Sequence, residues 1–231
     1  MTPELKQQVV EANQQLVAAG LVTLTWGNVS GIDRDSGLVA IKPSGVDYDA
    51  LTSDNIVVVN LDGEVVEGDL RPSSDTATHL ELYRNFSDIG AVVHTHSPQA
   101  TAFSQAGTPL PCLGTTHADH FYGEVPVARP LTPEEVDAGY ELATGVSIVE
   151  RFRELDLNPL EMPAILLKHH APFTWGKTPQ YAVDNAIALE MCCKMSLMTW
   201  QLNSKAAEIP RHILEKHHQR KHGKDAYYGQ K

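Results

Sequence analysis

The sequence is poor in cysteine and has no long apolar run. Its 231 residues include only three cysteines, Cys112, Cys192 and Cys193. This odd number without metal-type spacing argues against a disulfide framework and fits a reducing cytosol. No apolar stretch approaches the ~18 residues that cross a bilayer, and residues 1–15 are too polar for a secretory leader. We therefore expect a cytoplasmic protein with no membrane partner.

Basic residues are also scarce. The chain has 18 lysines and arginines against 29 aspartates and glutamates, which gives a formal net charge of −11. This balance argues against a general nucleic-acid-binding protein, because such proteins use Lys and Arg to displace counterions from phosphates. A small anionic ligand is compatible with the charge, since a few focused donors override it locally.

The apolar content of 42% is sufficient for a folded core, and no repeat or linker divides the chain, so we expect one domain over residues 1–231. Helical and strand-like patterns are interspersed. Asp62 and Gly63 predict a hairpin turn, and Thr132 with Glu135 predicts a capping box. This mixture favours an α/β domain with a mixed sheet over a helical bundle or an all-β sandwich. The strand-like segments are 21–25, 38–42, 56–61, 64–67, 89–96 and 164–168; the helical segments are 3–19, 98–106, 178–202 and 209–221, with a further helix start at 73–75.

Histidines provide the first chemical signal. His94 and His96 lie at the end of a strand-like segment, and residues i and i+2 of a strand face the same side. Two such imidazoles either share a cation or bond to each other. His169 and His170 follow a second apolar strand, and one of them would complete a set of three, because adjacent strand residues face opposite ways. Three histidines with one open position are typical of catalytic zinc.

Two further features leave alternatives open. Asp75 follows two serines at a helix start, where it is either a fourth ligand or an N-cap. His117 and His120 have the i, i+3 spacing of a helix and form an alternative metal pair. However, Gly114 and the two threonines after it predict a solvated loop for that stretch.

Three turns are candidate anion sites. Ser73 and Ser74 offer hydroxyls and backbone N–H groups at a helix start. Residues 42–45 place a lysine before a turn whose glycine permits close approach of a ligand. Gly27 and Asn28 form a third turn. Each is weak alone, but together with a metal site they indicate a phosphate-bearing ligand.

Nucleotide cofactors are not supported. Residues 171–178 nearly match a phosphate-binding loop, but Ala171 replaces its first glycine and Pro172 lacks an N–H. No G-x-G-x-x-G motif follows a strand-like segment either, so the sequence does not predict nicotinamide chemistry.

The C-terminal segment is basic and ends in aromatic residues. His217 and His222 lie among lysines and arginines, which disfavours a metal site there, although Arg220 is suited to an anion. Tyr228 is unusual so close to a chain end, because termini are commonly dispensable. An aromatic tail of this kind docks either on its own subunit or on a neighbouring one.

These motifs together resemble the L-ribulose-5-phosphate 4-epimerases of the class II, metal-dependent sugar-phosphate aldolase superfamily. The resemblance covers nearly the whole chain. The matching motifs are LVTLTWGNVS (21–30), IKPSGV (41–46), VVEG (65–68), RPSSDTATHLELY (71–83), VVHTHS (92–97), GTTHAD (114–119), HAPFTWGK (170–177) and KHGKDAYYGQ (221–230).

The resemblance implies a single-domain α/β/α sandwich with a mixed, mainly antiparallel sheet. It implies a homotetramer with four-fold symmetry, in which a tail of about 209–231 contributes to a neighbouring subunit's active site. It also implies one zinc ion per subunit, or another divalent ion such as Mn²⁺ or Co²⁺. The implied ligands are His94, His96, His170 and Asp75.

The resemblance also implies residue roles. Asp119 and Tyr228 are the expected catalytic acid and base, with Tyr228 donated by a neighbouring subunit. Related fuculose- and rhamnulose-phosphate aldolases carry a glutamate where this chain has Asp75, so the aspartate favours an epimerase. Two departures are Ala171 in place of a glycine and His120 in place of an aromatic residue. The expected substrate-binding residues are Asn28, Lys42, Ser44, Gly45, Ser73, Ser74, Thr115, Glu141, His217 and Arg220.

Chemistry favours the same assignment. In L-ribulose 5-phosphate the carbonyl is C2, so the C4 hydrogen is not acidic and C4 inverts only by oxidation or by cleavage of C3–C4. Cleavage leaves an enediolate, whose charge a divalent cation stabilises as a Lewis acid. The alternatives are a class II aldolase that cleaves a related ketose phosphate, such as L-fuculose 1-phosphate, and a non-catalytic metal-stabilised protein. The sequence fits arabinose breakdown as well as ascorbate or xylulose use.

Overall fold

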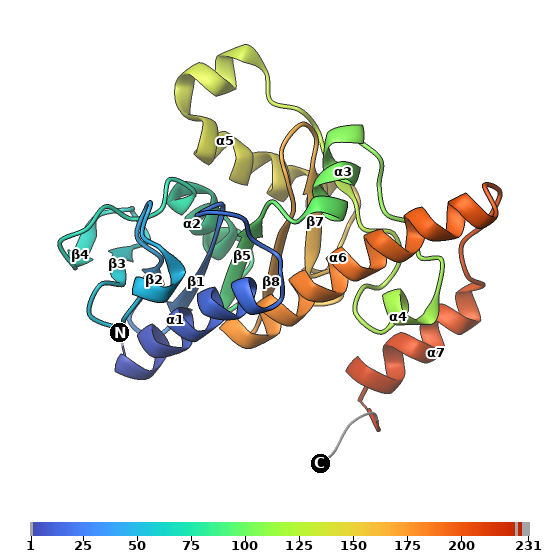
Figure 1. The fold of residues 1–231 in the computed structure, drawn as a ribbon, viewed down its shortest axis with the longest axis horizontal. Coiled ribbons are helices and arrows are strands. Elements are labelled where there is room, and N and C mark those ends of the chain that lie inside the picture. The colour runs from blue at the N-terminus through green and yellow to red at the C-terminus, as the bar shows by residue number, and fades with distance from the viewer. Residues whose placement is uncertain (1, 225, 228–231) are drawn as a thin grey trace.

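The computed structural model describes residues 2–224, 226 and 227. Its centre is an eight-stranded sheet with the order β4-β3-β2-β1-β5-β8-β7-β6, in which every pair is antiparallel except β6 with β7 (Figure 1). The predicted mixed, mainly antiparallel sheet is thus confirmed. The strands are β1 Gly27–Asp33, β2 Leu38–Ile41, β3 Val57–Asn60, β4 Val65–Glu67, β5 Ala91–Thr95, β6 Val127–Ala128, β7 Ala164–Leu167 and β8 Phe173–Gly176.

Helices cover both faces of the sheet. The first and sixth helices pack on one face, and the second and fifth pack on the other (Figure 1). The predicted α/β/α arrangement is therefore confirmed. The helices are α1 Pro3–Ala18, α2 Thr76–Asn85, α3 Pro98–Ala106, α4 Thr115–Ala118, α5 Pro133–Glu154, α6 Pro179–Leu202 and α7 Arg211–His222, with one 3-10 turn at Tyr48–Ala50.

The alternation of side chains along β5 decides where its polar end points. Ala91 and Val93 belong to the apolar cluster beneath α1 and α6, whereas Val92 belongs to the cluster beneath α2 and α5. His94 is two residues beyond Val92 and therefore faces the α2 and α5 side. The register pairs it with Asn28 on β1 and with Phe173 on β8.

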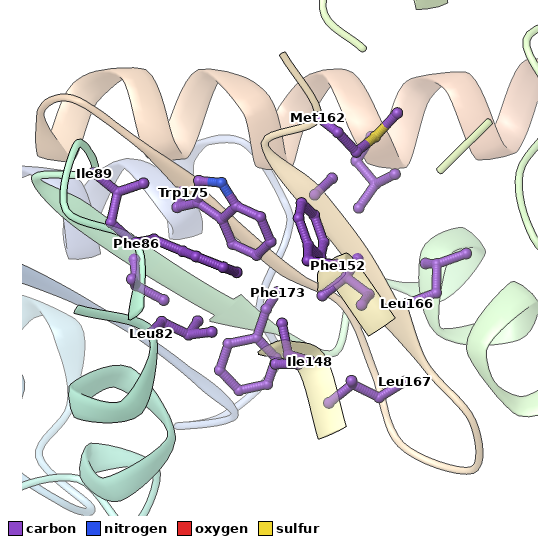
Figure 2. Close-up of a cluster of buried hydrophobic side chains, with 14 of the residues drawn as sticks. Leu82, Phe86, Ile89, Ile148, Phe152, Met162, Leu166, Leu167, Phe173 and Trp175 are labelled. Carbon is purple, nitrogen blue, oxygen red and sulfur yellow. The ribbon is translucent and has the colours of Figure 1, made fainter. Parts of the chain in front are cut away.

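An aromatic cluster fixes α2 and α5 against the sheet (Figure 2). Phe86, Phe152 and Trp175 have ring centroids 5.2–5.4 Å apart in pairs. The buried indole N–H of Trp175 donates a hydrogen bond of 2.7 Å to the carbonyl of Pro159. Large buried rings dominate the energetics of such contacts, so this cluster holds α2 and α5 against the sheet.

Several helix ends follow the sequence signals. Thr132 and Glu135 form both hydrogen bonds of the predicted capping box, and Thr2 caps α1 by accepting a hydrogen bond from the N–H of Leu5. Gly107 ends α3 with a φ of 65°, a conformation that glycine adopts at little cost.

Two local predictions are wrong. Residues 21–25 are not a strand, because hydrogen bonds from Trp26 N to Thr23 O and from Gly27 N to Thr25 O fold the segment into turns. The strand begins at Gly27 and was missed, since it is rich in glycine and polar residues. The predicted loop at 115–120 contains α4, a short helix that packs on α7 and α6.

Candidate functional site

Three histidines converge at the C-terminal end of β5. The rings of His94, His96 and His170 have centroids 4.8–5.2 Å apart. Each ring offers a nitrogen, and these three atoms lie within 4.8 Å of one another. His170 therefore joins the His94–His96 pair. Its neighbour His169 is exposed and has a φ of 66°, which turns the chain sharply just before His170.

The triad fits a divalent metal ion. The Nε2 atoms of His94 and His96 are 3.1 Å apart, close to the ~3.3 Å expected for two nitrogens about 2.0–2.1 Å from one tetrahedral zinc ion. His94 donates its Nδ1–H to the carbonyl of Pro172 at 3.0 Å, which fixes the tautomer and leaves Nε2 as a lone-pair donor. Burial lowers the pKa of His96 and of His170 to about 4, so both rings are neutral at pH 7.

Asp75 lies beside the triad at the start of α2. Asp75 is the N-cap residue of α2, as one of the two alternatives predicted, but its carboxylate makes no side-chain capping bond. Instead, Oδ2 accepts a hydrogen bond of 2.6 Å from the amide of Asn28. Burial raises the pKa of Asp75, but His94, His79 and the Asn28 bond outweigh it, and the pKa is lowered. The carboxylate is ionised and close to the histidines, and its predicted role as a fourth ligand stays a prediction.

A series of buried, hydrogen-bonded polar side chains lies next to Asp75 in the interior of the protein. His79 lies one helical turn after Asp75 and is fully buried. Its Nδ1 is 2.7 Å from the hydroxyl of Ser30, which is 2.7 Å from the hydroxyl of Tyr83. Burial lowers the pKa of His79 to about 3, so a neutral ring lies behind the carboxylate. Sequence reasoning missed this residue, although its i+4 spacing from Asp75 is a usable signal.

The triad opens into a cavity of about 570 Å³ that also contains most of the predicted phosphate-binding residues. The histidine triad and the predicted phosphate-binding residues therefore face the same cavity within one chain. Of the predicted substrate-binding and metal-ligating residues, those that line this cavity are Asn28, Lys42, Ser44, Gly45, Ser73, Ser74, Asp75, His94, His96, Glu141 and His170.

The polar loops at the cavity are joined by backbone hydrogen bonds. Ser44 N donates to Arg71 O at 2.9 Å, and Ser73 N donates to Lys42 O at 3.0 Å. Lys42 itself is 1% exposed, and its ammonium donates to the carbonyls of Val46 and Pro43. Burial lowers its pKa. The lysine thus holds the loop from beneath and contributes positive potential under the predicted phosphate position.

The remaining predicted residues gather elsewhere. The carboxylate of Asp119, which follows α4, receives hydrogen bonds from Arg220 at 2.6 and 3.0 Å and from His217 at 3.1 Å. Partial burial raises the pKa of Asp119, but the bonds from Arg220 and His217 outweigh it and lower the pKa. Asp119 is therefore an ionised carboxylate bound to α7, and Thr115 is exposed at the start of α4.

The residues around Asp119 and those that line the cavity are separate within one chain. Figure 1 shows α4 and α7 together toward one end of the longest axis, while β2 and α2 lie toward the other. Of the described residues that line the cavity, none belongs to α4 or α7. Tyr228 lies outside the described residues. The chain thus carries the predicted metal-binding and phosphate-binding residues in one place and Asp119 in another.

Buried histidines at the α4–α7 contact predict acid sensitivity. Burial lowers the pKa of His117 and of His218 from 6.5 to about 4. The unfolded chain therefore binds more protons between these values, and stability is lost as the pH falls below 6.5. We expect the free energy of unfolding in urea to fall between about pH 6.5 and 4.5. The decrease should be smaller in His117→Gln and unchanged in the exposed control His212→Gln; equal slopes in all three would contradict this.

Comparison with known proteins identifies the family. The model of the class II aldolase and adducin N-terminal domain matches residues 7–197. The chain belongs to this class II aldolase family. A structure of L-fuculose 1-phosphate aldolase is 27% identical, with a TM-score of 0.79, over 94% of this chain and 95% of its own. YgbL from Klebsiella pneumoniae, a candidate aldolase/epimerase/decarboxylase, is 25% identical, with a TM-score of 0.74 over 94% and 99%.

A third class II structure, l-fuculose-1-phosphate aldolase from Thermus thermophilus, is 28% identical over 89% of this chain and 98% of its own, with a TM-score of 0.69. Class II aldolases depend on a divalent metal, and the histidine triad supplies a fitting set of ligands. In the part of the chain that the structure describes, no helix is long and apolar enough to cross a membrane.

Proposed function

We propose that the protein is an L-ribulose-5-phosphate 4-epimerase that interconverts L-ribulose 5-phosphate and D-xylulose 5-phosphate. The observation that carries this proposal is the placement of three histidines, the carboxylate of Asp75 and a serine-rich anion pocket around one cavity. The resemblance associates an aspartate, rather than a glutamate, at this position with the epimerases. Zinc is the metal we propose, with Mn²⁺ and Co²⁺ as substitutes.

The proposed reaction breaks and reforms one carbon–carbon bond. A base removes the C4 hydroxyl proton, the C3–C4 bond breaks, and its electron pair stays on C3. The fragments are the enediolate of dihydroxyacetone and glycolaldehyde phosphate. A divalent cation held by the triad would act as a Lewis acid toward the developing negative charge. The aldehyde then turns its other face toward C3, the bond reforms, and a proton returns to the C4 oxygen.

Residues of the protein bind the substrate phosphate and transfer protons to and from the C4 oxygen. Ser44, Ser73 and the N-terminus of α2 bind the phosphate, which keeps the aldehyde fragment in place while it turns. Attack on two faces requires proton donors on opposite sides of the aldehyde. We assign these roles to Asp119 and Tyr228, with the ionised state of Asp119 suited to a base in the resting enzyme.

The separation of Asp119 from the cavity supports a site between subunits. Within one chain Asp119 is bound to α7, away from the histidines. A second copy that presents its α4 and tail of about 209–231 at the cavity completes the set. We therefore propose a homotetramer with four-fold symmetry, in which each active site combines two subunits.

Turnover before and after metal removal tests the proposal. The isolated protein is expected to convert L-ribulose 5-phosphate to D-xylulose 5-phosphate, to lose this activity on chelation, and to regain it with Zn²⁺, Mn²⁺ or Co²⁺. A chiral assay separates the two sugar phosphates. Activity that survives complete metal removal would contradict the role of the triad.

The second candidate is an aldolase, favoured by the similarity to L-fuculose 1-phosphate aldolases. The same preparation would then cleave L-fuculose 1-phosphate and release both fragments, with no interconversion of the pentulose phosphates. A metal-stabilised binding protein would unfold on chelation without turning over either sugar.

A further inference from the structure

Two aromatic side chains flank the histidine triad, and neither belongs to the predicted site. The ring of Trp26 lies 6.5 Å from that of His96, and the ring of Tyr140 lies 5.8 Å from that of His170, measured between centroids. Both line the same cavity, yet 54% of Trp26 and 38% of Tyr140 is exposed. We call this pair the aromatic rim.

A tight backbone turn places the indole of Trp26 beside the triad. Gly27 follows it with a φ of 145°, and a Cβ there would lie 2.8 Å from a Val22 methyl carbon and 2.9 Å from His94 O. Only glycine fits such a close approach. Leu24 adds a φ of 53°, unusual for a residue with a side chain. This tight turn holds Trp26 beside the end of β5.

A similar backbone feature presents Tyr140. Gly139 interrupts α5 with φ 155° and ψ 90°, so the helix bends immediately before the tyrosine. The next residue is fixed, because the hydroxyl of Thr78 on α2 donates a hydrogen bond of 2.6 Å to the carbonyl of Glu141. The phenol ring is thereby placed beside His170, whereas Trp26 lies beside His96.

The proposed reaction has an intermediate that must be protected from water. While the aldehyde turns, the enediolate is exposed to protonation at C3, which would end the cycle with free dihydroxyacetone and glycolaldehyde phosphate. In that side reaction the proton lost from the C4 hydroxyl is replaced at C3 through water, so no co-reactant is consumed. Retaining the intermediate therefore requires that water be kept from C3.

Resting on the proposed function, we propose that the aromatic rim is a retention device: Trp26 and Tyr140 cover the bound fragments and keep water from C3 until the bond reforms. Both rings are broad and apolar, and they flank the triad at two different histidines. Retention distinguishes an epimerase, which recombines its fragments, from an aldolase, which releases them. The rim is thus a determinant of reaction outcome rather than of metal binding.

The test measures how often the fragments escape. Full-length Trp26→Ala and Tyr140→Ala enzymes are supplied with L-ribulose 5-phosphate, and released dihydroxyacetone and D-xylulose 5-phosphate are quantified together. We expect the ratio of released dihydroxyacetone to D-xylulose 5-phosphate to rise at least about 10-fold in both variants, because water reaches C3. The ratio should stay at the wild-type value in Trp26→Phe and Tyr140→Phe, which keep a ring, and in Tyr181→Ala, an exposed aromatic of α6.

Metal content of each variant is measured alongside and is expected to equal that of the wild type. A fall in total turnover with an unchanged product ratio would overturn the retention role, and so would a raised ratio accompanied by metal loss. If the wild-type enzyme itself leaves L-ribulose 5-phosphate unchanged, the proposed function fails, and the rim's role in it fails for that separate reason.

Discussion

Replacing His96 by asparagine is expected to reduce turnover of L-ribulose 5-phosphate by at least about 100-fold, since even outer partners of metal ligands commonly contribute 10–100-fold. An amide is a poor substitute for a neutral imidazole, and only His94 and His170 would remain as nitrogen ligands. The side chain of His96 lines the cavity rather than the apolar core, so its replacement should leave the fold intact. Metal per chain, measured by atomic emission, should fall together with turnover.

His169→Asn is the matched control for this prediction. His169 is exposed, adjoins His170, and has a φ of 66° that asparagine tolerates better than most residues. Its replacement by asparagine should leave both metal content and turnover near wild type. If this variant lost the metal while His96→Asn retained it, the ligand set would be wrong.

The sequence predicted local structure best where the interacting residues are only a few positions apart in the chain. Thr132 and Glu135 are three residues apart, and the spacing alone implied their reciprocal hydrogen bonds. His94 and His96 share a side because strand alternation is a local rule. The choice between His169 and His170 depended on the backbone turn at His169, which no nearby residue signals.

Contacts between residues far apart in the sequence could not be predicted from these local rules. The bonds between Asp119 and Arg220 join residues 101 positions apart, and the polar strand β1 is stabilised by burial between β2 and β5 rather than by its own residues. Trp26 and Tyr140 were overlooked because neither is a charged or metal-ligating residue. Their signal was the glycine beside each one, which permits an unusual backbone.

Mixing two inactive variants should restore activity if each site combines two subunits. Asp119→Asn keeps the shape of the side chain but removes the proposed base, and loss of acid–base catalysis typically costs about 10²–10⁴-fold. His96→Asn chains lack one of the proposed metal ligands but retain Asp119. Co-refolded in equal amounts, the two variants form sites in which one chain supplies the intact triad and its neighbour supplies the intact Asp119.

Random assembly of the two variants determines the fraction of intact active sites. A working site needs the triad from an Asp119→Asn chain and the carboxylate from a His96→Asn chain, so about one quarter of the sites in a symmetric oligomer are intact. We expect the mixture to reach about one quarter of wild-type turnover, far above either variant alone. A double variant carrying both changes, mixed with wild type, gives the complementary dilution curve. If the mixed variants remained inactive while the wild type refolded fully, both halves of the site would belong to one chain, and α7 would have to release Asp119 toward its own cavity.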